Sequence, residues 1–135
     1  MYNSAVAASV EMLQKVPLFA DLDRRELQDV ASSMHERRVA AGDVVLEQGA
    51  AGAGFFVVDE GTAEVTVDGD PVGTIGPGDY FGEIALLTGS DRTATVTAQT
   101  DMLCYGLTTW DFKPLVESNS GIGWKLLTAM ARKLR

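Results

Sequence analysis

Apolar residues recur at helical spacing near the start of the chain, over residues 4–35. Residues three and four positions apart lie on one face of an α-helix, so this pattern predicts helices with one apolar face. Pro17 interrupts the pattern, and Asp23 with Glu26 has the spacing of a capping box. We therefore expect two short helices, the second beginning near Asp23. The apolar positions that define them are Val10, Leu13, Val16, Leu27, Val30, Ala31 and Met34.

A second helical pattern covers residues 109–135. It predicts a short helix over residues 111–117, a break at the Ser, Asn and Gly cluster of residues 118–121, and a longer helix beyond that cluster. The apolar residues of the longer helix are Ile122, Leu126, Leu127, Met130 and Leu134, with Trp124 among them. Their simplest interpretation is packing against a core.

Between these two parts, over residues 39–107, the hydrophobic period changes to two and glycines become frequent. Short alternating runs separated by Gly, Pro and Asp turns are typical of antiparallel strands. The expected strands are residues 44–46, 55–58, 65–67, 72–75, 93–97 and 103–107. Residues 82–87 break the alternation with good helix formers, so we expect one or two helical turns inserted there. The predicted fold is α+β but mainly β: an antiparallel jelly-roll β-barrel with N-terminal helices, the short inserted helix and C-terminal helices, in one domain over residues 1–135.

The charge balance narrows the choice of partners. Eleven Lys and Arg against nineteen Asp and Glu give a formal net charge of −8 and a pI of about 4.5. An acidic surface repels polyanions, which argues against nucleic-acid binding, but it leaves room for one small anion in a local pocket. The sequence shows neither an apolar stretch long enough to span a bilayer nor a basic secretory start. We therefore expect a cytoplasmic protein without membrane insertion.

Few residues offer metal or nucleophilic chemistry. Cys104, the single cysteine, lies in an apolar run and is interpreted as a core residue, which agrees with a reducing compartment. His35, the single histidine, lies in a charged run that we place outside the barrel, without a second His or Cys nearby. A cupin-type enzyme would need several histidines on barrel strands. We accordingly expect no enzyme activity, no metal and no cofactor.

One segment combines groups that suit a phosphate attached to a ribose. Gly82 opens the predicted inserted helix, whose first backbone N–H groups are free to bind an anion. Arg92 follows after a polar loop, and its planar guanidinium can bind two phosphate oxygens. Glu83 is a hydrogen-bond acceptor, so a ligand would present hydroxyl donors to it, as a sugar does. Taken alone, Arg92 and Glu83 could equally form a structural ion pair.

These residues carry a family resemblance. The run Phe81-Gly82-Glu83-Ile84-Ala85-Leu86-Leu87 with Arg92-Thr93-Ala94 resembles the phosphate-binding segment of the cyclic nucleotide-binding domain family. The likeness extends over residues 10–135 and includes Phe55-Phe56-Val57-Val58 with Gly61. Because the motif is long and its parts occur in the order found in the family, it is far more specific than a lone glycine motif.

The resemblance implies a set of ligand contacts. Arg92 matches the arginine that binds the cyclic phosphate, and Glu83 matches the glutamate that binds the ribose 2′-hydroxyl. The matching phosphate cradle comprises Gly82, Ile84, Ala85, Thr93 and Ala94, and the matching base and sugar side comprises Val65, Val72 and Gly73. The family binds its nucleotide without turning it over, so the resemblance implies a sensor in which the C-terminal helices close as a lid. Leu126, Leu127 or Met130 would then cap the base.

Several alternatives stay open at this point. We expect cAMP rather than cGMP, although the threonine at Thr93 accompanies a cGMP preference in some members of the family. Ala53 stands where kinase-type domains have an aspartate that supports the phosphate arginine, which favours an alternative: a binding-incompetent jelly-roll module that docks a partner protein. The expected partners are a small-molecule cyclic nucleotide and an effector domain or partner protein, with the oligomeric state left open.

Overall fold

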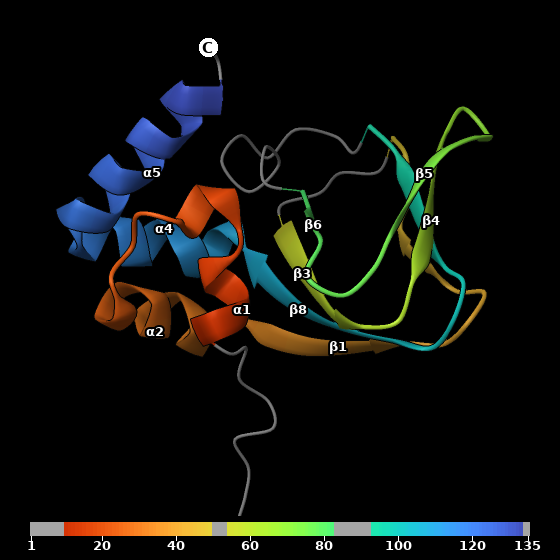
Figure 1. The fold of residues 1–135 in the computed structure, drawn as a ribbon, viewed down its shortest axis with the longest axis horizontal. Coiled ribbons are helices and arrows are strands. Elements are labelled where there is room, and N and C mark those ends of the chain that lie inside the picture. The colour runs from red at the N-terminus through yellow and green to blue at the C-terminus, as the bar shows by residue number, and fades with distance from the viewer. Residues whose placement is uncertain (1–9, 50–53, 83–92, 134–135) are drawn as a thin grey trace, which may run out of the picture.

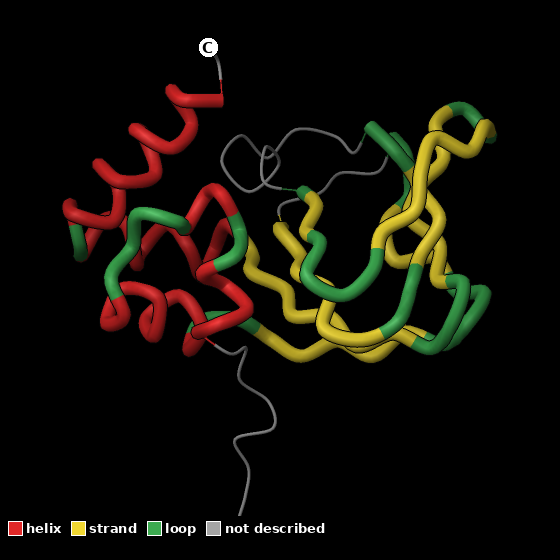
Figure 2. Tube along the Cα trace, in the orientation of Figure 1, coloured by secondary structure: helices red, strands yellow, loops and turns green. Residues whose placement is uncertain are grey.

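Two antiparallel sheets lie beside a layer of helices in a computed structural model, which describes residues 10–49, 54–82 and 93–133 (Figure 1). The helices are α1 (Val10–Gln14), the 3-10 helix η2 (Pro17–Phe19), α2 (Arg24–Ser32), α4 (Thr109–Ser118) and α5 (Ser120–Lys133). The strands are β1 (His35–Val39), β2 (Val44–Leu46), β3 (Gly54–Glu60), β4 (Ala63–Val67), β5 (Asp70–Ile75), β6 (Tyr80–Phe81), β7 (Thr95–Ala98) and β8 (Met102–Thr108). The helices gather at one end of the strands, as the red and yellow parts of Figure 2 show.

Among the described residues, each sheet has four strands. The first sheet has the order β1-β8-β3-β6 and the second has the order β2-β7-β4-β5, with every neighbouring pair antiparallel. Strands far apart in the chain are neighbours in both sheets, as expected for a jelly-roll rather than for a simple series of hairpins. The predicted mainly β architecture with flanking helices is therefore confirmed.

The first sheet is buried on both faces. Toward the helices, Phe55 and Val57 of β3 pack with Leu107 of β8 in a core that includes the buried faces of η2, α2 and α5. Toward the second sheet, Val58 and Cys104 pack in a separate core between the sheets. A strand covered on both faces loses the alternation of apolar and polar residues, which explains the continuous apolar run of β8.

The start of the first sheet differs from the prediction. His35 was expected to end a helical region outside the barrel, but it begins β1 and pairs opposite Gly106 of β8. The strand was missed because its run of charged residues looks like a solvated helix end. β1 is an edge strand, and charged side chains suit an edge because they discourage pairing with another chain. His35 Nε2 lies 2.9 Å from Asp111 Oδ2, which ties β1 to α4.

Smaller differences concern element boundaries. The strand expected over residues 72–75 begins two residues earlier, at Asp70, as part of β5, an edge strand in which Pro71 is tolerated. The two-residue strand β6 was not predicted. The helix break expected over residues 118–121 narrows to Asn119. Of the helical turns expected over residues 82–87, only Gly82 lies within the described residues.

The capping box at the start of α2 is confirmed. The Asp23 carboxylate accepts a hydrogen bond from the Glu26 backbone N–H at 2.9 Å, and the Glu26 carboxylate accepts one from the Asp23 backbone N–H, also at 2.9 Å. Within the described ranges no helix is long and apolar enough to cross a membrane. The same part of the chain holds no group of three or more His, Cys, Asp or Glu side chains that could bind a metal ion.

Candidate functional site

The described ends of the predicted phosphate-binding segment lie on different sheets. Gly82 directly follows β6 of the first sheet, whereas Thr93 and Ala94 directly precede β7 of the second sheet. Thr93 is exposed and Ala94 is half-buried. The predicted contacts Glu83, Ile84, Ala85 and Arg92, together with Ala53, lie outside the described residues. The connection that carries the motif therefore joins the two sheets.

The residues expected on the base and sugar side lie on two neighbouring strands. Val65 of β4 pairs opposite Gly73 of β5 on one side and opposite Val96 of β7 on the other. The Val65 side chain packs against the core between the sheets. Val72 is 61% exposed, and an added Cβ at Gly73 would meet no atom within 4 Å. The structure thus brings Val65 and Gly73 together and leaves Val72 turned to solvent.

The strand that leads into the motif is held from the side of the barrel by stacked rings. Phe81 of β6 stacks on Phe56 of β3, with ring centroids 5.3 Å apart and an interplanar angle of 19°. The Arg37 guanidinium lies 5.6 Å from the centroid of the Phe56 ring, a cation–π arrangement. A Cβ added at Gly106 would come within 2.8 Å of the same ring, so Gly106 gives the ring its space. Sequence reasoning missed Arg37 and Gly106, because both contacts with Phe56 depend on the pairing of β1 and β3 with β8.

The same strand is held from the helical side by other rings. Tyr80 of β6 lies 5.9 Å from Phe55, and Phe55 lies 5.5 Å from Phe19 of η2 in an edge-to-face arrangement. Phe19 and Phe55 are fully buried. β6 therefore contacts the barrel core through Phe81 and the helical core through Tyr80.

The predicted base-capping residues of α5 have three different environments. Leu126 is buried in the core between the helices and the first sheet, Met130 lies at the edge of that core, and Leu127 is 64% exposed. Ile122, one turn before Leu126, is fully buried in the same core. In the described conformation α5 therefore turns Leu126 toward the helices and Leu127 toward solvent.

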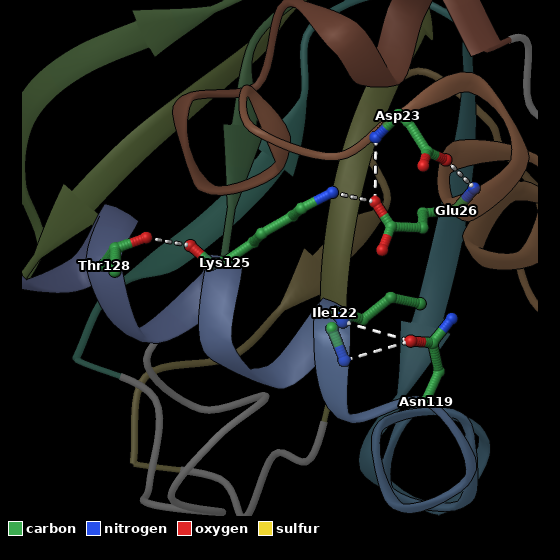
Figure 3. Close-up of polar contacts among 7 residues, drawn as sticks. Asp23, Glu26, Asn119, Ile122, Lys125 and Thr128 are labelled. Atoms are coloured by element: carbon green, nitrogen blue, oxygen red, sulfur yellow. Dashed lines mark hydrogen bonds and ion pairs between the residues drawn. The ribbon is translucent and has the colours of Figure 1, made fainter.

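Charged contacts hold α5 against residues 17–32. Lys125 Nζ lies 2.6 Å from Glu26 Oε1, the oxygen that also accepts the Asp23 N–H (Figure 3). Further along the helix, the Arg132 guanidinium pairs with the Asp21 carboxylate. The hydrogen bond to Glu26 raises the pKa of Lys125 above its ordinary value, so the ammonium is held charged. We call the surface of residues 17–32 that carries Asp21 and Glu26 the α5 seat.

The beginning of α5 is fixed by its preceding residue. The Asn119 side-chain oxygen accepts hydrogen bonds from the backbone N–H groups of Gly121 at 3.1 Å and Ile122 at 3.3 Å (Figure 3). This satisfies two of the donors that a helix N-terminus leaves free. A defined break separates α4 from α5, so the two helices are distinct units.

The fold defines a β domain of two sheets with a layer of helices. Its candidate site lies on the connection between β6 of the first sheet and β7 of the second sheet. Comparison with known proteins specifies the family. Residues 36–119 match the family model of the cyclic nucleotide-binding domain. This match covers more than half of the chain, which therefore belongs to the cyclic nucleotide-binding domain family.

Similar proteins include both kinase subunits and transcriptional regulators. The chain is 42% identical over 92 residues to the cAMP-dependent protein kinase regulatory subunit of Yarrowia lipolytica, a match that covers 67% of this chain and 24% of that protein. The crystal structure of the N-terminal domain of a transcriptional regulator from Streptomyces coelicolor is similar with a TM-score of 0.86 and 33% identity, covering 92% of both chains. The regulatory domain of Toxoplasma gondii PKA, co-crystallised with cAMP, is similar with a TM-score of 0.74 and 28% identity, covering 92% of this chain and 48% of that one. The chain spans about a quarter of the length of the curated relative it matches.

Proposed function

We propose that this chain forms one regulatory domain that binds a cyclic nucleotide, cAMP in preference to cGMP. The observation that carries the proposal is the family match, within which the Phe81–Leu87 and Arg92–Ala94 motif lies on the connection between β6 and β7. The similarity to a cAMP-dependent kinase subunit and to a regulatory domain co-crystallised with cAMP supports cAMP as the ligand.

In this proposal each polar group of the motif has one task. Arg92 binds the cyclic phosphate, because a guanidinium offers two parallel N–H donors and stays charged when it is partly buried. Glu83 accepts a hydrogen bond from the ribose 2′-hydroxyl. Gly82 and Thr93 add backbone contacts at the two ends of the connection. One cation and oriented amides are enough for a monoanion, which reconciles the ligand with a net charge of −8.

We further propose that ligand binding changes the position of α5 rather than starting a reaction. The domain binds and releases its nucleotide unchanged, without a cofactor. A ligand moves an equilibrium only as far as it binds one state better than the other. Here the two states would be α5 on its seat and α5 released, and the readout would pass to an effector domain or a partner protein.

The test compares Arg92→Ala with a matched arginine control by isothermal titration calorimetry with cAMP. Losing a charged hydrogen bond costs about 1.5 to 3 kcal/mol, so Arg92→Ala should weaken binding by about 10- to 150-fold or more. The control is Arg38→Ala, because Arg38 is an exposed residue of β1 that pairs with Glu36. Equal affinity of wild type and Arg92→Ala would show that Arg92 does not bind the phosphate.

A second candidate function is a module that docks a partner protein without binding nucleotide. Ala53 favours it, since the arginine that matches the phosphate ligand would lack a supporting carboxylate from that position. Thermal denaturation with and without each nucleotide separates the two functions. A ligand that binds only the folded state must raise the melting temperature, so no shift with either cAMP or cGMP at millimolar concentration would favour the docking module.

A further inference from the structure

Three aromatic rings connect the strand before the candidate site with the helical layer. The register places Tyr80 of β6 opposite Val57 of β3, on the helical side of the first sheet, where the Tyr80 ring meets Phe55 at 5.9 Å. Phe55 meets Phe19 of η2 at 5.5 Å with an interplanar angle of 82°. The Phe19–Phe55 pair is edge-to-face, whereas the Phe55–Tyr80 pair is tilted, with an interplanar angle of 41°. Aromatic pairs at such centroid distances contribute beyond their buried area, so these contacts resist rearrangement. We call Phe19, Phe55 and Tyr80 the aromatic bridge.

The far end of this bridge is the α5 seat. Phe19 is the last residue of η2, and Asp21 lies only two residues beyond it. Asp21 binds Arg132 of α5, and the buried Ile122 and Leu126 of α5 share one core with Phe19. A displacement of the Phe19 ring would therefore act directly on the surface that holds α5.

The near end of the bridge is the short strand β6, and the two residues before it, Gly78 and Asp79, form backbone hydrogen bonds with Val58 of β3. β6 is two residues long and pairs with β3 only through Tyr80 and Phe81 among the described residues. The two side chains are anchored on opposite faces, Tyr80 on the helical core and Phe81 on Phe56 in the barrel. Packed interiors do not deform continuously, so a shift of β6 must repack one of these ring contacts.

We propose that Tyr80 is a positioning residue that couples β6 to the α5 seat through Phe55 and Phe19. The inference rests on the proposed function, because it assumes that cyclic nucleotide binding acts on the segment that β6 leads into along the chain. Ligand binding that shifts β6 then moves the Tyr80 ring, and the rings of the bridge pass the displacement to η2. By linkage, seating or release of α5 changes nucleotide affinity by the same factor.

The experiment measures amide hydrogen exchange over α5 with and without saturating cAMP in the whole chain. Exchange reports how often the helix leaves its seat, so its fold-change on ligand addition measures the coupling. In the wild type we expect a change of about 5- to 150-fold, the usual range of coupling between two sites. Tyr80→Leu should reduce this fold-change by about 2- to 30-fold while cAMP still binds. Tyr80→Phe keeps the ring and should restore the wild-type response.

Two further variants make the test specific. Trp110→Leu removes an aromatic side chain that is 80% exposed on α4 and should leave the response unchanged. Phe19→Leu interrupts the bridge at its other end and should reduce the fold-change in α5 exchange as Tyr80→Leu does. If Tyr80→Leu folds poorly, Phe19→Leu therefore serves as the test of the aromatic bridge. An unchanged response in both Tyr80→Leu and Phe19→Leu, or a lost response in Tyr80→Phe, would overturn the coupling role.

The outcomes also separate this inference from the proposed function. If the wild type does not bind cAMP, the proposed function fails before any variant is compared. If the wild type binds cAMP and α5 exchange responds, but Tyr80→Leu and Phe19→Leu respond equally, the sensor function stands and the aromatic bridge does not carry the coupling.

Discussion

Gly82 offers a sharp test of the candidate site, because its backbone has a conformation that L side chains rarely adopt. Its φ is +91°, directly after β6 and at the first position of the proposed phosphate cradle. Holding a side chain at such an angle costs about 1 to 3 kcal/mol. Gly82→Ala should relieve this strain by rotating away from the native φ, which changes the path of the chain at its entry into the motif. Cyclic AMP must then restore the native φ, so its affinity should fall by about 5- to 150-fold.

Gly78 provides the matched control, four residues earlier in the turn before β6. Its φ is +90°, and an added Cβ there would meet no atom within 4 Å. Gly78→Ala should therefore lose about 1 to 3 kcal/mol of folding stability in urea denaturation, but it should keep wild-type cAMP affinity by calorimetry. Equal cAMP affinity of Gly82→Ala and wild type would refute the assignment of Gly82 to the ligand site.

Three other predictions concern the fold that supports the site. Gly61→Ala places a Cβ 2.3 Å from the Asp101 carbonyl oxygen, at a residue whose φ is +92°. We therefore expect the free energy of unfolding in urea to fall by about 2 to 6 kcal/mol. An unaltered unfolding midpoint would contradict this expectation. Because Glu26 raises the pKa of Lys125, the stability that this pair contributes is present below the ordinary pKa of 10.5 and is lost as the pH rises through the raised value. The stability difference between wild type and Lys125→Met should thus be constant below pH 10.5 and shrink as the pH rises above it, and a difference that does not depend on pH would count against the ion pair. Burial raises the pKa of the Cys104 thiol, so a thiolate-selective reagent should modify it in unfolded protein and leave native protein unmodified near pH 8.

The sequence pattern predicts those parts of the fold in which local chemistry and tertiary packing agree. The capping box of Asp23 and Glu26 forms as predicted, because its hydrogen bonds span only three residues. Most of the expected strands appear close to their predicted positions, since their alternation or apolar character matches their burial. The prediction fails at β1, where the charged run beginning at His35 becomes a strand only through its pairing with β8. Such pairing joins residues about 70 positions apart and leaves no local signal.

The sequence likewise predicts only part of the candidate site, namely the residues of the contiguous motif. A motif contiguous in sequence identifies Gly82 and Thr93 as the ends of one connection, and the structure places them next to β6 and β7. The supporting contacts come from elsewhere in the chain: Arg37 and Gly106 around Phe56, and Glu26 beneath Lys125. These contacts depend on sheet register and helix packing, which a motif does not encode.

Calorimetric titration of the wild-type protein with cAMP, cGMP and acyclic 5′-AMP tests the central claim most directly. The account predicts saturable binding of cAMP, weaker binding of cGMP, and much weaker binding of 5′-AMP, whose open phosphate does not match a site for a cyclic monoanion. Absence of binding for both cyclic nucleotides, or equal binding of cAMP and 5′-AMP, would contradict the assignment of this domain as a cyclic nucleotide sensor.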